Sequence, residues 1–156
     1  MTSSAPASSP ESRNPRSLRA IVDGRELLTA PGHMTVAAAA KLMRERRVGA
    51  ILVMEYSRLS GIFTERDALF RVLAESRDAT TTLLATVMTP NPKSIHPDRL
   101  IGDALAIMHQ GRFRHVPVVE DGRPIGVISS RDAMGGELEQ FMYSLIVEDH
   151  ARDVLA

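Results

Sequence analysis

The segments GIFTERD (residues 61–67) and GVISSRD (residues 126–132) stand 65 residues apart in a chain of 156 residues. When the chain is aligned with itself at this offset without gaps, residues 35–68 and 100–133 give ten identities in 34 pairs. Such a repeat is one supersecondary unit that buries its apolar face against a neighbour. The chain is too short for two unrelated domains of full size. The sequence therefore predicts two copies of one small unit.

Each copy is predicted to fold as β-α-β-β-α, which gives an α/β (α+β) fold. Helical spacing of apolar residues predicts the first helix of each copy: Val36, Ala39, Ala40, Met43; Ile101, Ala104, Leu105, Met108. Apolar runs then predict a hairpin in each copy, with a short strand ahead of each helix: 50–54, 59–63, 116–119, 124–128; 28–30, 94–96. A second helix is expected from Thr64 and from Ser129, with Leu69, Val72 and Leu73 as its buried face in the first copy.

The composition of the remaining segments predicts the boundaries. Residues 1–17 are rich in Ser, Ala and Pro and predict a disordered tail. The first repeat then covers 18–77, a linker 78–92 and the second repeat 93–134. Apolar residues from Leu18 to Leu28 predict a short helix or strand that docks onto the body. Gly135-Gly136 ends the repeat, and residues 136–156 are expected to form an amphipathic C-terminal helix that needs a partner surface.

Composition and motif searches narrow the function classes. Nineteen basic side chains balance nineteen acidic ones, so we expect neither nucleic acid nor a membrane surface as a partner. The chain has no cysteine and no apolar run of about 20 residues, and its N-terminus has no apolar signal core. These features predict a cytoplasmic protein. The five histidines lack ligand spacing and no catalytic motif occurs, so we expect neither a metal site nor an enzyme.

A family resemblance rests on the order of several short motifs. VMTP (87–90), RHVPVV (114–119) and GVISSRD resemble the second half of a tandem CBS domain pair, a family named after cystathionine β-synthase. GIFTERD stands at the equivalent place in the first copy, so the resemblance covers residues 21–134. It implies two units with pseudo-twofold symmetry, their sheets packed together, and two clefts between them for adenosine nucleotides. It also implies a homodimer that stacks into a flat disc.

The resemblance implies that Thr64 and Ser129 contact phosphate and that Asp67 and Asp132 contact ribose. Each pair also stands directly before a predicted helix, where a hydroxyl and a carboxylate three residues later cap the free backbone donors. Both interpretations stay open. A nucleotide would gain from the helix N-terminus and from an outward-facing carboxylate. Arg66 and Arg131 are either phosphate clamps or solvated side chains of the helix surface.

The strand starts are the candidates for an adenine slot, and they are equally plausible as core: Gly49, Ala50, Ile51; His115, Val116, Pro117. Because aromatic residues are few, we expect an adenine to rest against aliphatic side chains. The first copy has Leu52 in place of Pro117 and Gly49-Ala50 in place of Arg114-His115, which allows one cleft to be degenerate. We therefore favour the cleft of Ser129 and Asp132, joined by Ser94 and Ile95.

Three functions follow from these residues. The leading hypothesis is a stand-alone regulatory module that binds AMP, ADP or ATP, ahead of S-adenosylmethionine or NADH, although no cofactor is certain. Its repeats or its dimer would rearrange and act on an effector protein in trans, with the helix after Gly136 as the contact. The second is an interaction module with empty clefts. The third is a nucleotide-processing enzyme, which lacks visible machinery. The cluster Arg44, Arg46 and Arg47 is assigned to helix capping rather than to nucleic acid.

Overall fold

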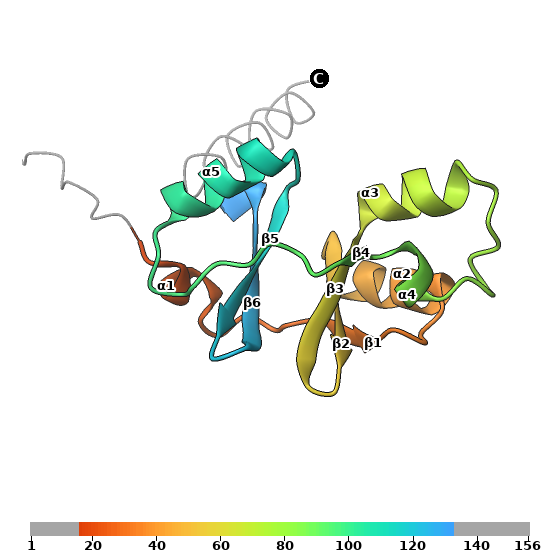
Figure 1. Cartoon of the computed structure of the whole chain (residues 1–156), viewed down its shortest axis with the longest axis horizontal. Helices are drawn as coiled ribbons and strands as arrows, with labels where there is room; N and C mark the ends of the chain where they lie inside the picture. Colours follow the sequence, from red (N-terminus) through yellow and green to blue (C-terminus); the bar gives the residue numbers. More distant parts are fainter. Residues whose placement is uncertain (1–15, 133–156) are drawn as a thin grey trace, which may run out of the picture.

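The computed structural model describes residues 16–132. The predicted C-terminal helix (136–156) and all but the last two residues of the predicted tail (1–17) lie outside the described residues. Figure 1 shows two α/β units side by side, which agrees with the predicted tandem repeat and fold class.

The first repeat is a four-stranded sheet with helices. It contains β1 (Thr29–Pro31), α2 (Val36–Arg46), β2 (Ala50–Glu55), β3 (Arg58–Thr64), α3 (Glu65–Asp67) and the π-helical η1 (Ala68–Leu73). The order in the sheet is β1-β2-β3-β4, where β4 is Thr89–Pro90. β1 runs parallel to β2, and the β2–β3 hairpin is antiparallel. The predicted strands and first helix are thus present with nearly the expected bounds.

The second repeat follows the same order with a smaller sheet. It contains α5 (Ile101–Gly111), β5 (His115–Glu120) and β6 (Arg123–Ser129), and its sheet has two strands. The strand predicted at 94–96 is reduced to one parallel bridge between Ile95 and Val118. In the first repeat the Leu52 N–H donates to the Leu28 carbonyl at 3.1 Å. Its counterpart Pro117 has no N–H to donate, so this ladder is shorter.

The two hairpins make the same tight turn from different residues. Asp121 and Gly122 have φ of 50° and 76°, as their turn signal predicts, and Tyr56 and Ser57 have φ of 48° and 62°. Both central positions therefore lie in the left-handed region, which two-residue hairpins of the I′ type require. The weaker signal of the first copy was sufficient because the paired strands on both sides fix the turn.

The short helices before the repeats are exchanged between them (Figure 1). α1 (Leu18–Val22) contributes Leu18, Ile21 and Val22 to the core of the second repeat. α4 (Leu84–Val87) lies in the predicted linker and packs into the core of the first. The Leu18 N–H donates to the Arg99 carbonyl and the Leu84 N–H donates to the Met34 carbonyl, both at 2.9 Å. The exchange is reciprocal, so each repeat is completed by a segment that precedes the other.

Two glycines make room for the exchanged segments. A Cβ built on Gly126 would lie 2.5 Å from Val22, and one built on Gly61 would lie 2.2 Å from the Met88 sulfur. Both distances are far below van der Waals contact. Gly126 is therefore required by the close packing of Val22, whereas at Gly61 a Cβ would be admitted only if the flexible Met88 side chain moved.

The second helix of the first repeat differs from its prediction. Val72 is buried, but Leu69 and Leu73 are 50% and 71% exposed, so the predicted buried face is wrong at these two residues. The Ala74 N–H donates to the Leu69 carbonyl, five residues back. In such a π-helical stretch, residues spaced for an α-helix no longer share one face.

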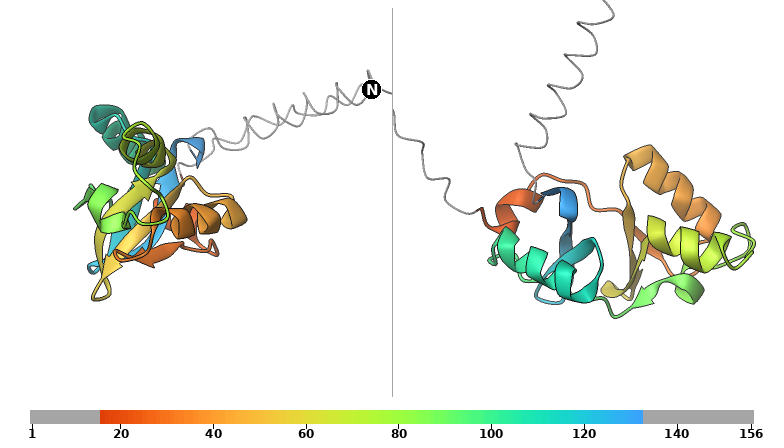
Figure 2. Two further views of the ribbon diagram at one scale, coloured as in Figure 1. Left: turned by 90° about the vertical axis from the view of Figure 1, so that its right-hand side faces the viewer. Right: turned by 90° about the horizontal axis from the view of Figure 1, so that it is seen from above.

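A third apolar cluster joins the repeats. Ala50, Leu52 and Ile62 of the first sheet are buried together with Leu27, Leu59 and Val127 packed against them. The two sheets therefore face each other through β2, β3 and β6. Figure 2 shows that α2 and α5 lie on the outer sides of the two units. This arrangement leaves the ends of the strands and the starts of the second helices at the junction.

Candidate functional site

Two cavities lie at the junction between the repeats. One has a volume of 650 Å³ and is lined by Thr64 and Asp67 of the first motif. The other has a volume of 790 Å³ and is lined by Ser129 and Asp132 of the second. We call them the Asp67 cavity and the Asp132 cavity. Small-molecule sites typically enclose about 300–1,000 Å³, so either cavity is large enough for a nucleotide.

Each cavity combines the motif of one repeat with the strand start of the other. The Asp67 cavity takes residues 112–115 from the second repeat, and the Asp132 cavity takes residues 47–50 from the first. These two segments are equivalent at the offset of 65 residues. The cavities are therefore related to each other as the repeats are, and a molecule in either one would contact both repeats.

The carboxylate of Asp67 caps the second helix of the first repeat. Its Oδ2 accepts from the Thr64 N–H at 2.9 Å and from the Thr64 hydroxyl at 3.1 Å, while Thr64 Oγ1 accepts from the Asp67 N–H at 3.3 Å. This is the predicted capping box. Its Oδ1 lies 3.5 Å from Nε of Arg71, whose Nη1 also donates to the carbonyls of Val87 and Met88. Arg71 thereby ties the cap to α4.

Asp132 has the same role with a different arginine. Its Oδ2 accepts from the Ser129 N–H at 2.7 Å and from the Ser129 hydroxyl at 3.3 Å. Its Oδ1 pairs with Nη1 of Arg25 at 2.7 Å, from the segment between α1 and β1. Both motif carboxylates are thus occupied on both oxygens. An ionised carboxylate offers about four acceptor sites, and Arg25 is 49% exposed, so Oδ1 of Asp132 can accept from a ribose either beside Arg25 or in its place.

The cavities take in some of the predicted site residues and leave out others. Thr64, Arg66, Asp67 and His115 line the Asp67 cavity. Gly49, Ala50, His115, Ser129, Arg131 and Asp132 line the Asp132 cavity. Five predicted residues line neither of these cavities: Ile51, Val116, Pro117 and Ile95 are buried, and Ser94 is exposed.

The structure brings crossed partners to both motifs. His115 at the strand start of the second repeat lines the Asp67 cavity, and Gly49 and Ala50 of the first repeat line the Asp132 cavity. His115 lines the Asp132 cavity as well, so the strand start of the same repeat also accompanies Ser129 and Asp132. The crossing follows from the way the two sheets face each other, which chain order does not reveal.

Several lining residues were missed by the sequence analysis. Arg71, Lys93 and Arg112 line the Asp67 cavity, and Arg25 lines the other. One signal was available: Arg112 and Arg47 are identical residues at the repeat offset, each at the left-handed end of a helix. Phe70 and Phe113 line the Asp67 cavity. Phe63 lines the Asp132 cavity. Aromatic side chains are thus present in both linings, and the aliphatic surroundings expected for an adenine stay a prediction.

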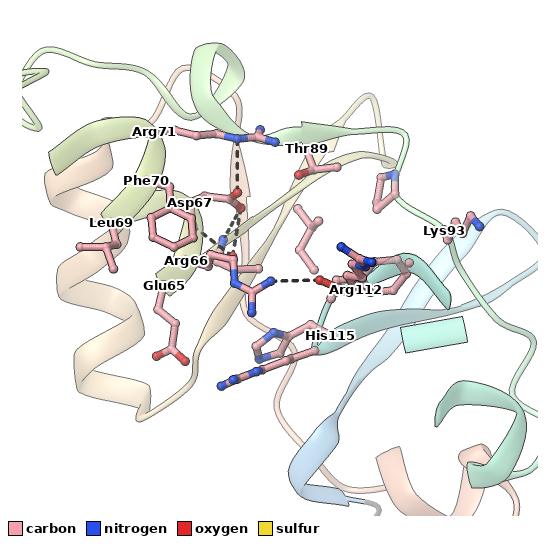
Figure 3. Close-up of a pocket in the computed structure, with 16 residues that line it drawn as sticks. Glu65, Arg66, Asp67, Leu69, Phe70, Arg71, Thr89, Lys93, Arg112 and His115 are labelled. Carbon is pink, nitrogen blue, oxygen red and sulfur yellow. Dashed lines mark hydrogen bonds and ion pairs between the residues drawn. The ribbon is translucent and has the colours of Figure 1, made fainter. Parts of the chain in front are cut away.

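Positive charge is concentrated in both cavities. The Asp67 cavity is lined by five cationic side chains and two acidic ones: Arg66, Arg71, Lys93, Arg112, Arg114; Glu65, Asp67. The Asp132 cavity has five and three: Arg25, Arg44, Arg47, Arg114, Arg131; Glu26, Glu65, Asp132. Arg66 crosses the junction and donates to the Arg112 carbonyl at 3.0 Å (Figure 3). In a chain of zero formal net charge, this local excess favours an anionic ligand.

His115 lies between the two cavities and lines both. Burial lowers its pKa from 6.5, and the nearby Arg114 and Arg131 lower it further, while Glu65 and Asp132 oppose this shift. The imidazole is therefore neutral at pH 7 in the described structure.

Two other kinds of site were searched for in residues 16–132. No group of three or more His, Asp or Glu side chains is placed to hold a metal ion there. In the same range, no helix combines the length and the apolarity that crossing a bilayer requires.

The comparisons with known proteins agree with this architecture. The family model for the CBS domain matches residues 19–74 and 84–138. The Arabidopsis thaliana protein CBSCBSPB3 is 41% identical over 93 residues, which are 60% of this chain and 16% of that protein. The chain thus spans only a small part of that relative.

Solved structures give the same result. A putative signal-transduction protein with CBS domains from Burkholderia ambifaria MC40-6 superimposes with a TM-score of 0.71 at 32% identity, over 75% of this chain and 90% of that one. The CBS domain pair of protein MJ0100, solved with 5′-methylthioadenosine and S-adenosyl-L-methionine, shares the fold with a TM-score of 0.67 at 24% identity, over 75% and 96%. With two matched domains over most of its length, the chain belongs to the CBS domain family as a tandem pair.

Proposed function

We propose that this CBS pair is a regulatory module that binds an adenosine-type nucleotide in the cavities between its repeats and passes the occupancy on to a partner. The carrying observation is that each cavity takes its walls from both repeats. A ligand can shift a conformational equilibrium only by its differential affinity for the two states. A ligand that contacts both repeats binds two arrangements of the repeats with different affinity, because moving one repeat against the other changes its contacts.

The chemistry of the Asp67 cavity supports a nucleotide with a phosphate. Phe70 and Phe113 offer aromatic surface for the base, and Lys93, Arg112 and Arg114 offer cations for the phosphate. AMP, ADP and ATP share the adenosine group with the two ligands of the MJ0100 domain pair. We place AMP, ADP and ATP first because S-adenosylmethionine carries a positive charge that these cations would repel.

The Asp132 cavity is the second candidate and offers a different route to the ribose. Arg25 holds Asp132 Oδ1 in the described structure. A ribose hydroxyl that takes over this oxygen frees the Arg25 guanidinium for a phosphate in the same cavity. Ligand entry would thus exchange an ion pair within the protein for one with the ligand.

Thermal unfolding of the full chain with AMP, ADP, ATP, S-adenosylmethionine and NADH tests the proposal. A ligand that binds only the folded state adds about 2.7 kcal/mol at 100 times its dissociation constant. Lys93→Gln removes a cation from the Asp67 cavity and Arg44→Gln one from the Asp132 cavity, and neither residue caps a motif. Arg58→Gln, on β3 and outside both cavities, is the matched control.

We expect one cavity variant to lose most of the nucleotide shift while Arg58→Gln keeps it. If none of the five compounds raises the melting temperature, the nucleotide proposal fails. The alternative is then an interaction module without a ligand, which the full engagement of both motif carboxylates by caps and arginines favours.

The partner surface is a separate part of the proposal. We infer a homodimer and an effector contact that involve the segment after Gly136. Removal of residues 136–156 should change the molar mass measured by light scattering or the binding of the effector. An unchanged mass together with unchanged effector binding would contradict this part and leave nucleotide binding untouched.

A further inference from the structure

Three side chains belong to both cavities. Glu65, Arg114 and His115 line the Asp67 cavity and the Asp132 cavity alike. We call these three residues the shared wall. In Figure 3, Glu65 extends from the start of α3 toward His115, which lies at the start of β5. The two cavities are therefore neighbours separated by one layer of ionisable side chains.

The shared wall exists because the repeats differ at this point. Arg114 and His115 in the second repeat correspond to Gly49 and Ala50 in the first. A Cβ on Gly49 would lie 3.2 Å from His115 Nε2 and 3.3 Å from Glu65 Cδ. The second repeat thus supplies the charged, bulky pair, and the first supplies the space that the pair occupies. A single arginine and a single imidazole serve two cavities, where full symmetry would have supplied two of each.

We propose that the shared wall couples the two cavities, so that an anionic ligand in one weakens the binding of an anionic ligand in the other. The inference rests on the proposed nucleotide binding and goes beyond it, because two sites need not influence each other. The physical reason is that two phosphates, each drawn to Arg114, compete for one guanidinium and repel each other across a thin wall. By linkage the effect is the same in both directions.

His115 makes this coupling depend on pH. Its imidazole faces Glu65, Arg114, Arg131 and Asp132, and burial keeps it neutral at pH 7. A phosphate beside it favours the protonated ring, so binding takes up a proton. A lower pH promotes this proton uptake, and the protonated ring is a second cation between the cavities, which strengthens anion binding on both sides and reduces the competition for Arg114.

The test is isothermal titration of the full chain with AMP, with adenosine as the ligand that lacks the charge. Thr89→Trp is designed to obstruct the Asp67 cavity and Ala40→Trp the Asp132 cavity, whose linings contain these residues. A variant that binds a single AMP then reports the other cavity alone. Without coupling, the product of the two stepwise association constants of the wild type equals the product of the two single-cavity constants. Coupling free energies between sites are typically equivalent to 5- to 150-fold in affinity.

At pH 8 we expect the wild-type product for AMP to be at least about fivefold smaller than the single-cavity product, with a ratio near one for adenosine. A wild type that binds one AMP where each single-cavity variant also binds one is the limiting case and supports the proposal. At pH 6 the AMP ratio should move toward one. The AMP phosphate contributes to this change itself, because its second pKa is about 6. His115→Gln should therefore reduce the pH dependence to that contribution, and His109→Gln, an exposed histidine of α5, should keep it in full.

Two failures are distinguishable. If AMP binds twice with a ratio of one at both pH values, the coupling is wrong and the proposed function stands. If neither AMP nor adenosine binds to the wild type or to either variant, the coupling proposal fails, and the proposed function falls with it only if none of the five compounds raises the melting temperature.

Discussion

The two repeats carry the same motif and build sheets of different size. The first has four strands, and the second has two strands and one bridge. One edge of the difference traces to position 52 and its counterpart 117, where Leu52 donates a hydrogen bond to Leu28 and Pro117 has no N–H. At the other edge of the first sheet, β4 pairs with β3. Both side chains are nonetheless fully buried. The comparison teaches that the apolar core defines the unit, while the length of the sheet edge is free to vary between copies.

The largest expected effect concerns the exchanged helices. Leu18 and Leu84 are completely buried in opposite repeats. Leu18→Ala and Leu84→Ala should each lower the free energy of unfolding by about 2–5 kcal/mol, the range for leucine truncation in a core. Urea denaturation measures the loss, and hydrogen exchange locates it. Leu18→Ala should expose β5 and β6 amides first, and Leu84→Ala those of β2 and β3. The opposite assignment would contradict the exchange.

The second largest effect is expected at Gly126 and Gly61, which pack closely against the exchanged segments. Gly126→Ala should destabilise by about 1–3 kcal/mol, the usual range for overpacking, because its new Cβ meets the stiff side chain of Val22. Gly61→Ala should cost less, since Met88 is flexible and can rotate away. The double variant Gly126→Ala with Val22→Ala serves as the control. Its two effects should not add, and strict additivity would show that the two residues do not clash.

Two substitutions at the sheet edge exchange the hydrogen-bonding property of position 52 with that of its counterpart 117. Leu52→Pro removes the hydrogen bond to Leu28 and leaves the carbonyl of this half-buried residue without its donor, which costs about 1–3 kcal/mol. Pro117→Ala restores an N–H opposite Lys93, and we expect stability to stay within about 0.5 kcal/mol because the new bond offsets the lost rigidity. Amide exchange at position 117 is the readout. Rapid exchange there would mean that proline is not what limits the sheet.

The smallest effect is a pH dependence from the shared wall. Burial holds the folded-state pKa of His115 below 6.5, its value in the unfolded chain. Between the folded-state pKa and 6.5 the unfolded chain binds more protons than the folded one, so stability falls as the pH drops through this window. Melting temperatures between pH 8 and pH 5.5 should therefore decline more in the wild type than in His115→Gln. The acidic groups with lowered pKa, Asp78 and Glu120, act only near and below pH 4.5. Parallel curves for the two proteins would rule out the burial effect.

Much of the fold could be predicted because the repeat supplies each pattern twice. The helices at 36–46 and 101–111 and the four hairpin strands follow from apolar spacing that recurs at one offset. The placement of α1 and α4 could not be predicted. A five-residue helix with apolar residues at Leu18, Ile21 and Val22 fits either core equally well, and only three-dimensional packing decides between them. The exposure of Leu69 and Leu73 was hidden by the π-helical turn.

The candidate site was predictable in its motifs and unpredictable in its assembly. Thr64 with Asp67 and Ser129 with Asp132 form the expected caps at cavities. Which strand start faces which motif depends on how two sheets meet, and local sequence carries no signal for it. Arg71 could not be predicted for the same reason. It contacts Asp67 together with Val87 and Met88, which are close to it in the fold but far from it in the sequence.

The reciprocal exchange of α1 and α4 sets the order in which the protein can be completed during synthesis. As the chain leaves the ribosome, α1 emerges first, and the core that buries it includes residues as late as Ile128. The first repeat must likewise wait for residues 84–90 before its sheet and core are closed. The core of the first repeat runs from Ala30 to Met88 and is contiguous in the chain, so this repeat can close before the second one is made. The apolar side chains of α1, in contrast, stay exposed until β6 has been synthesised. The helix that leaves the ribosome first is therefore among the last to be buried.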